Sequence, residues 1–146
     1  MRLINTKNVP ELSEFIGDSS SIPQYAILSH TWEDEEITLQ QLSDPACAQK
    51  KGLRKIQQTC TLAAQNGFDF AWVDTCCIDK RASAELSEAI NSMFRWYQDA
   101  AVCYVFLADL DPSASLEGSL PHCRWFTRGW TLQELIAPRE VLFYDR

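Results

Sequence analysis

Two tryptophans, two arginines and one carboxylate lie within the segment from Arg124 to Leu135. Trp130 and Glu134 are four residues apart, so a helix would place their side chains next to each other on its surface. The aromatic ring can hold a flat cationic ring, and the carboxylate beside it can stabilise a positive charge that develops during a reaction. The same spacing fits an exposed glutamate beside a half-buried tryptophan. Spacing alone therefore leaves a ligand site and an ordinary surface pair both open.

Two further polar clusters follow apolar segments earlier in the chain. The first is Ser29-His30-Thr31-Trp32, and the second begins at Asp74. His30 is either an acid–base group, because imidazole changes charge near neutral pH, or a hydrogen-bonded structural residue. Trp32 is either a stacking surface or a lid over the core, and Asp74 either binds a ligand hydroxyl group or caps the next turn. We therefore treat both clusters as candidate site residues.

The sequence does not contain the common metal and nucleotide motifs. Cys76 and Cys77 are adjacent rather than separated by two residues, and the chain has two histidines, His30 and His122. This pattern argues against a zinc site, and it does not specify which cysteine and which histidine would form a catalytic pair. The chain also lacks Gly-x-Gly-x-x-Gly, a phosphate loop ending in Gly-Lys-Ser/Thr, and Gly-x-Ser-x-Gly. We expect neither a metal nor a bound cofactor.

The segment that carries Glu134 is expected to form one helix, from Arg124 to about Ile136, ended by Ala137-Pro138. Apolar and small residues recur along it at helical spacing and predict a face that packs on the sheet. These residues are Trp125, Gly129, Leu132 and Ile136. A second face of the same helix would carry Thr127, Trp130, Thr131 and Glu134.

Strand and helix patterns alternate through the rest of the chain. Apolar runs predict strands at 25–29, 68–73, 102–107 and 140–144, with a short edge strand at Arg2–Asn5. Helical spacing predicts a helix over 53–65, with a stripe of Leu53, Ile56, Cys60 and Ala64. It predicts another over 84–100 after an N-cap at Ser83, with a stripe of Leu86, Ile90, Met93 and Tyr97. A loop is expected at 111–121.

This alternation predicts a mainly parallel sheet with helices on both faces. In such folds, ligand sites lie outside the C-terminal ends of the strands. The clusters at Ser29 and Asp74 both fall at such ends, and Ala108-Asp109 follows the strand expected at 102–107. Chain order alone therefore predicts that all three clusters share one edge of the sheet.

The composition indicates one globular domain over residues 1–146, with 46% hydrophobic residues and five tryptophans. The net charge of −7 argues against a nucleic-acid surface, which needs clustered Lys and Arg. No apolar run has the length of a membrane helix, and the N-terminus does not resemble a signal peptide. Six cysteines without a secretion signal favour a reducing, cytoplasmic setting. Because the chain stops directly after an expected strand, we expect it to belong to a longer protein.

Four long motifs closely resemble the fungal heterokaryon-incompatibility (HET) domain, and the resemblance covers about residues 25–145. They are Tyr25-Ala26-Ile27-Leu28-Ser29-His30-Thr31-Trp32, Trp72-Val73-Asp74-Thr75-Cys76-Cys77-Ile78-Asp79-Lys80, Leu86-Ser87-Glu88-Ala89-Ile90-Asn91-Ser92-Met93, and the segment from Arg124 to Glu140. The resemblance implies a role in fungal non-self recognition and programmed cell death. It also implies that the domain is the N-terminal effector part of a longer receptor, partnered by sensor and oligomerisation domains.

A more distant resemblance is to Toll/interleukin-1 receptor (TIR) domains. Trp130-Thr131-Leu132-Gln133-Glu134-Leu135 is similar to the Trp-Cys-Leu-x-Glu-Leu segment of plant TIR domains, with Thr131 in place of the cysteine. The resemblance implies a TIR-like, flavodoxin-like three-layer sandwich with a mainly parallel central sheet. It also implies that Glu134 matches the glutamate that is catalytic in NAD cleavage. The acidic run after Trp32 departs from the TIR pattern, so the nucleotide pocket is not transferred in detail.

These resemblances lead to two functional hypotheses. The first is a cell-death effector that cleaves NAD, as a substrate, at the nicotinamide–ribose bond, with Glu134 as the catalytic residue. Its substrate-binding residues would be Ser29, His30, Trp32, Asp74 and Trp130. The alternative is a non-enzymatic signalling module that acts by self-association. Trp130 and the acidic run 33–36 would then form an interface, and Glu134 would be structural or a surface charge.

Overall fold

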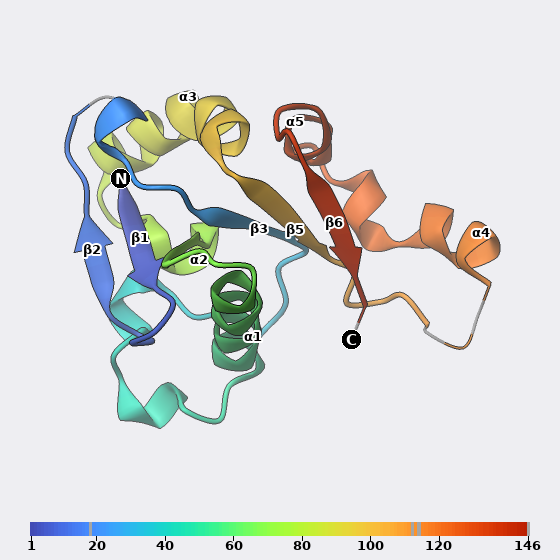
Figure 1. Cartoon of the computed structure of the whole chain (residues 1–146). Coiled ribbons are helices and arrows are strands. Elements are labelled where there is room, and N and C mark those ends of the chain that lie inside the picture. Colours follow the sequence, from blue (N-terminus) through green and yellow to red (C-terminus); the bar gives the residue numbers. More distant parts are fainter. Residues whose placement is uncertain (18, 112, 114, 146) are drawn as a thin grey trace.

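The computed structural model describes residues 1–17, 19–111, 113 and 115–145. Its centre is a six-stranded sheet with the strand order β2-β1-β4-β3-β5-β6 (Figure 1). The strands are β1 (Arg2–Asn5), β2 (Leu12–Glu14), β3 (Ala26–His30), β4 (Phe70–Trp72), β5 (Val102–Phe106) and β6 (Val141–Tyr144). The pairings among β4, β3, β5 and β6 are parallel, whereas β1 is antiparallel to both β2 and β4. The expected mainly parallel sheet is confirmed.

Helices cover both faces of the sheet. α1 (Lys51–Gln65) connects β3 to β4, α3 (Ser83–Asp99) lies between β4 and β5, and α5 (Thr131–Ile136) precedes β6. Figure 1 shows α1 on one face, and α3 and α5, which contact each other, on the opposite face. Because parallel crossovers are right-handed, a chain that turns back across β3 to reach β5 must place these helices on opposite faces. The strand order reverses between β3 and β5, which is where ligands of such sheets bind.

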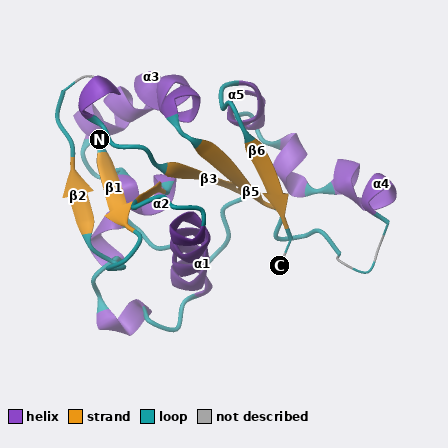
Figure 2. Cartoon of the chain, viewed as in Figure 1, coloured by secondary structure: helices purple, strands orange, loops and turns teal. Residues whose placement is uncertain are grey.

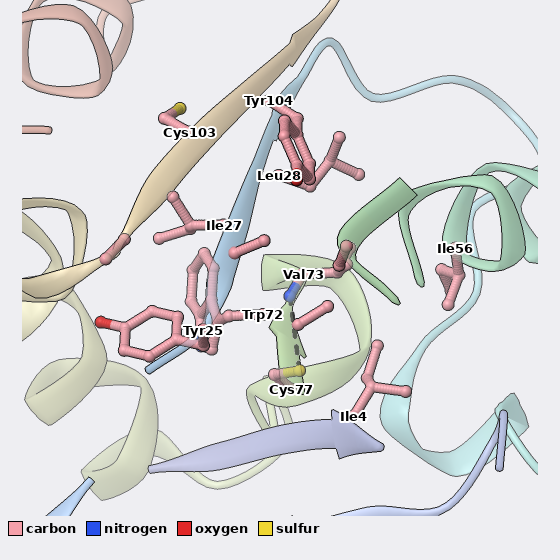
Figure 3. Packing of buried hydrophobic residues seen from close by; sticks show 14 of the residues in the cluster. Ile4, Tyr25, Ile27, Leu28, Ile56, Trp72, Val73, Cys77, Cys103 and Tyr104 are labelled. Carbon is pink, nitrogen blue, oxygen red and sulfur yellow. Dashed lines mark hydrogen bonds between the residues drawn. The ribbon is translucent and has the colours of Figure 1, made fainter. Parts of the chain in front are cut away.

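The core lies along the parallel strands. All five residues of β3 are buried, as its unbroken apolar run predicts for a strand covered on both faces. Figure 3 shows residues of β3, β4, β5 and α1 that build this core. Trp72 on β4 lies against two rings of α3, with centroid distances of 5.6 Å to Trp96 and 6.1 Å to Tyr97. These aromatic contacts hold α3 on the face of the sheet that carries the candidate site.

The N-terminal strand is not at the edge of the sheet. β1 is a strand as expected, but β2 pairs with its outer side and takes the edge position. β2 has three residues, too few to show an alternating pattern in the sequence. Short helical elements complete the chain: η1 (Ser19–Ser21), η2 (Leu39–Gln41), η3 (Pro45–Cys47), α2 (Asp74–Cys77), α4 (Leu116–Ser119), η4 (Leu120–His122) and η5 (Arg124–Thr127).

The single helix expected from Arg124 to Ile136 is wrong. The segment forms the 3-10 helix η5 and then α5, separated by residues 128–130, and the backbone of Arg128 is extended at φ −79° and ψ 144°. Figure 2 shows the connection from β5 to β6 as loops and short helical turns. Residues on opposite sides of the break therefore do not share a helix face, even where their spacing in the sequence is helical.

The break also overturns the expected packing face. Trp125 is fully buried, but Leu132 and Ile136 are 67% and 61% exposed. A Cβ added at Gly129 would meet no heavy atom within 4 Å, so this glycine makes no close approach to the sheet. Glu134, expected on the outer face, is 3% exposed. The surface-charge interpretation of Glu134 is therefore wrong.

Smaller differences concern the ends and stripes of the other helices. Ala64 of the expected α1 stripe is exposed, and its neighbour Ala63 is buried instead. Ser83 is the first residue of α3 rather than its N-cap, a position taken by Ala82. Ile90 of the expected α3 stripe is 45% exposed. The expected loop at 111–121 contains α4 and the start of η4; Pro112 and Ala114 lie outside the described residues.

Candidate functional site

A cavity of about 450 Å³ lies at the C-terminal ends of the parallel strands. The segments that follow β3 and β4 contribute Trp32, Asp74 and Lys80 to its wall. One side is apolar and comes from α3, with Leu86, Ile90, Met93 and Tyr97. The segment before β6 completes the wall with Arg128, Trp130 and Glu134. The volume is in the range of small-molecule sites, roughly 300–1,000 Å³.

Glu134 is held in the cavity wall by a contact with β3, which η5 supports from behind. Ser29 Oγ, on β3, donates a hydrogen bond of 2.5 Å to Glu134 Oε2. Trp125 Nε1 donates a hydrogen bond of 2.6 Å to the same Ser29 Oγ, so the hydroxyl is fixed in the orientation that points at the carboxylate. Thr131 Oγ1 donates to the carbonyl oxygen of Trp125 and joins α5 to η5. The position of the carboxylate is therefore set by neighbouring elements as well as by α5.

Arg128 pairs with the same carboxylate through both of its terminal nitrogens. Nη1 lies 2.8 Å from Glu134 Oε2, and Nη2 lies 2.9 Å from Oε1. This bidentate arrangement, with two parallel N–H···O hydrogen bonds, is the strongest geometry between a guanidinium and a carboxylate. The Arg128 side chain is 21% exposed and that of Glu134 is 4% exposed. The cation is thus the more accessible member of the pair, and it neutralises Glu134.

Asp74 is the second carboxylate of the cavity. His30 Nε2 lies 3.0 Å from its Oδ1, and Trp32 Nε1 donates a hydrogen bond of 2.8 Å to its Oδ2. Lys80 Nζ is 3.8 Å from Oδ2. Burial raises the pKa of Asp74, but the contacts with His30, Lys80 and Trp32 outweigh burial and leave this pKa below its ordinary value. Val73 occupies the N-cap of α2 without a side-chain bond, so Asp74 binds these three partners rather than capping the turn.

A buried lysine lies on the other side of the histidine. Lys55 Nζ, on α1, is 3.0 Å from His30 Nδ1 and 2.5 Å from Glu36 Oε1. An ammonium group can only donate, so Nδ1 accepts from Lys55 and Nε2 is the ring nitrogen that donates to Asp74. His30 and Lys55 are 2% and 6% exposed. A continuous chain of contacts therefore runs from Glu36 through the buried interior to Asp74.

The two tryptophans of the cavity are half exposed. Trp32 is 52% exposed and Trp130 is 44% exposed. Lys80 Nζ lies 3.4 Å from the centroid of the Trp32 ring, a cation–π distance. Because Trp32 faces the cavity and solvent, its position favours a stacking surface over a lid on the core. A flat ring of a ligand can reach both indoles from solvent.

All six residues named from the sequence lie around this site. Trp32, Asp74, Trp130 and Glu134 line the cavity, while Ser29 and His30 are buried behind it and are each bonded to one of its carboxylates. Sequence reasoning missed Lys55 and Lys80, and left Arg128 without a role. Lys80 could have been found from the sequence, because it closes the polar segment that begins at Asp74. Lys55 had no signal, because a lysine in a helix is normally exposed.

The cysteines are not part of the cavity. All six are buried free thiols. Within the described part of the chain, no three His, Cys, Asp or Glu side chains are grouped to hold a metal ion. In that same part, no helix has the length and apolar character needed to cross a membrane.

Comparisons with known proteins identify relatives of the chain. A family described as "Heterokaryon incompatibility protein (HET)" matches residues 25–122. The vegetative incompatibility protein HET-E-1 of Podospora anserina is 53% identical over 137 residues, which cover 88% of this chain and 10% of that protein. The chain thus spans about a tenth of the length of this relative. No solved structure matches the chain.

Proposed function

This chain belongs to the heterokaryon incompatibility (HET) family, and we propose that it is a cell-death effector domain that hydrolyses NAD at the nicotinamide–ribose bond. One observation carries the proposal: a single cavity joins Glu134 with two half-exposed tryptophans and two cations. Each part of NAD has a chemical counterpart there. The cations are Arg128 and Lys80, for the pyrophosphate, and the tryptophans are Trp32 and Trp130, for the rings.

The chemistry requires a negative charge beside the ribose. Hydrolysis breaks the bond between C1′ and the pyridinium nitrogen, and the bonding electron pair leaves with nicotinamide, which becomes neutral. Water adds to C1′ and gives up one proton, so the products are nicotinamide, ADP-ribose and a proton. The transition state resembles an oxocarbenium ion, and a fixed carboxylate stabilises its positive charge. We assign this role to Glu134, and we assign Asp74 to a ribose hydroxyl group.

The strand order supports a TIR-like fold for the domain. Numbered from β3, the four parallel strands lie in the order second, first, third and fourth. This is the order of the flavodoxin-like doubly wound sheet, whose ligands bind where the order reverses. The antiparallel pair β1 and β2 extends the sheet beyond that pattern. We place the reaction in the cytoplasm, within a longer receptor that also carries sensor and oligomerisation domains.

Release of nicotinamide tests the proposal. The purified chain is cross-linked into oligomers, incubated with NAD, and the free nicotinamide is measured by chromatography. We expect Glu134→Gln, which keeps the shape of the side chain, to slow release by about 100-fold or more. Glu140→Gln, an exposed glutamate six positions away, is the matched control and should keep the wild-type rate. Equally slow release from wild type and Glu134→Gln would refute the enzymatic role.

A second candidate function, self-association, is supported by the exposed apolar residues near β6. Six large apolar side chains between the start of η5 and the end of β6 are 37–67% exposed: Phe126, Trp130, Leu132, Leu135, Ile136 and Phe143. β6 is also the last strand in the sheet order. Monomeric proteins rarely expose so many large apolar residues in one region, and an open edge strand promotes pairing. The two functions are compatible, because the apolar residues lie mostly outside the cavity.

Sedimentation velocity tests the second candidate. Leu132→Glu should shift the chain towards monomer, because it places a charge in the proposed interface. Ile16→Glu is the matched control, since Ile16 is 88% exposed near β2, at the far edge of the sheet. A wild-type chain that remains monomeric, or an assembly that tolerates Leu132→Glu, would count against self-association through this surface.

A further inference from the structure

Glu134 is already neutralised in this structure. Arg128 occupies both carboxylate oxygens at 2.8 and 2.9 Å, and Ser29 also donates to Oε2. A carboxylate paired in this way stabilises a second positive charge only weakly, because the field of the ion pair is much smaller than that of a free anion. The proposed reaction therefore needs Arg128 to leave Glu134 first.

The geometry identifies Arg128 as the partner that moves. Glu134 is fixed from behind by Ser29, whose hydroxyl is in turn held by Trp125. Arg128 lies in the extended backbone between η5 and α5, so its side chain can turn without breaking a helix. Its side chain is also five times more exposed than that of Glu134, at 21% against 4%.

A second cation faces the same cavity. Lys80 lies 3.4 Å from the ring centroid of Trp32 and 3.8 Å from Asp74 Oδ2, and its side chain is 28% exposed. The separation from Asp74 is long for a direct hydrogen bond, so the ammonium group can donate to an anionic ligand without losing such a bond to Asp74. Lys80 and Arg128 thus offer two donors to one ligand.

We propose that Arg128 is a latch opened by an anion: a phosphate group that enters the cavity draws the guanidinium away from Glu134 and is held by Arg128 and Lys80. The ligand class is a diphosphate, such as the pyrophosphate of a dinucleotide. Binding of the anion exposes the negative charge of Glu134 inside the cavity. The catalytic consequence rests on the proposed function, whereas the anion site itself does not.

The latch also determines substrate choice. A nicotinamide riboside carries no phosphate, so Arg128 stays on Glu134 and the cavity remains neutralised. NAD opens the latch through its own pyrophosphate. The domain therefore hydrolyses NAD and leaves the riboside intact, although both contain the same scissile bond.

Calorimetric titration with inorganic pyrophosphate at low salt tests the anion site without any catalysis. Arg128→Gln should weaken binding at least about tenfold, the loss of one charge-assisted pair. Glu134→Gln should tighten binding by about tenfold, because Arg128 no longer has a competing anion. Arg124→Gln is the matched control and should change nothing, since Arg124 is exposed and pairs with Asp109 and Glu33 outside the cavity.

Several outcomes would overturn the latch. Glu134→Gln that binds pyrophosphate no more tightly than wild type would show that Glu134 and the anion do not compete. Undiminished binding by Arg128→Gln would remove Arg128 from the site. Arg128→Lys keeps the positive charge, so it should bind pyrophosphate more tightly than Arg128→Gln, and equal binding by these two variants would contradict the proposal. Thermal unfolding of each variant verifies that it is folded.

Nicotinamide release separates this inference from the proposed function. In cross-linked wild type, NAD should be cleaved in preference to the riboside, and Arg128→Gln should reduce that preference at least about tenfold. If no substrate releases nicotinamide but Glu134→Gln still tightens pyrophosphate binding, hydrolysis fails and the latch stands. If NAD is cleaved and Arg128→Gln keeps the preference, hydrolysis stands and the latch fails.

Discussion

Replacing Lys55 by methionine should destabilise the fold strongly, because the lysine side chain carries a buried charge. Its ammonium group lies 2.5 Å from Glu36 Oε1 and 3.0 Å from His30 Nδ1, and the residue is 6% exposed. Methionine has nearly the same length and keeps the apolar contacts of the side chain. The substitution therefore removes the charge while leaving packing almost unchanged.

The expected loss follows from what remains unpaired. Removing one partner of a buried ion pair costs about 3–5 kcal/mol, mostly because the other charge stays buried. The Glu36 side chain is 13% exposed, so water can partly rehydrate it. We therefore expect the low end of this range, about 3 kcal/mol. For a chain of this size the melting temperature should fall by about 6–12 °C.

Urea unfolding followed by circular dichroism measures this loss. Lys51→Met is the matched control, an exposed lysine of the same helix, and should cost less than about 0.5 kcal/mol. The double variant Glu36→Leu with Lys55→Met removes both charges and should recover most of the lost stability. A loss below about 1 kcal/mol for Lys55→Met would show that the pair behaves like an exposed salt bridge and would refute the reasoning.

Two further predictions concern ionisation. The pKa of Asp74 is below its ordinary value in the fold, so its stabilising contribution is full above the unfolded pKa of about 3.9 and is lost as pH falls through the lower folded pKa. The gap in urea midpoint between wild type and Asp74→Asn should therefore stay constant from about pH 5 upward and shrink below about pH 4; a gap that widens in acid contradicts this. Burial raises the pKa of Cys60 to about 12, and all six thiols are buried. A thiol reagent at neutral pH should therefore label native protein far more slowly than protein in urea, and fast native labelling would argue against this burial.

The regular elements were predictable because their signals are local. The apolar run of β3 and the helical spacing of α1 and α3 each describe one element, and the structure has all three. The parallel order of strands followed from the alternation of strands and helices. β2 was missed because a three-residue strand has no period to detect.

The segment from Arg124 to Ile136 shows where local signals fail. Its spacing predicts one helix with Leu132 and Ile136 inside, but the chain breaks at Arg128 and buries Glu134 instead. The cause is a set of long-range contacts: Ser29 is 105 residues from Glu134, and its hydroxyl binds both the carboxylate and Trp125. No periodic pattern within the segment contains that information.

The residue types at the candidate site were readable from the amino-acid sequence alone. Chain order places Ser29, His30, Trp32 and Asp74 at the C-terminal ends of parallel strands, and the family resemblance directs attention to Glu134. Their pairing could not be predicted, because Arg128, Lys55 and Lys80 look like ordinary exposed cations in the sequence. Folding brings a carboxylate oxygen to 2.8, 2.5 and 3.8 Å from these cations, respectively. The tertiary structure makes these pairs, since only burial turns a nearby charge into a strong partner. The sequence therefore identifies Glu134 as the candidate carboxylate, and the tertiary structure neutralises its charge by pairing it with Arg128.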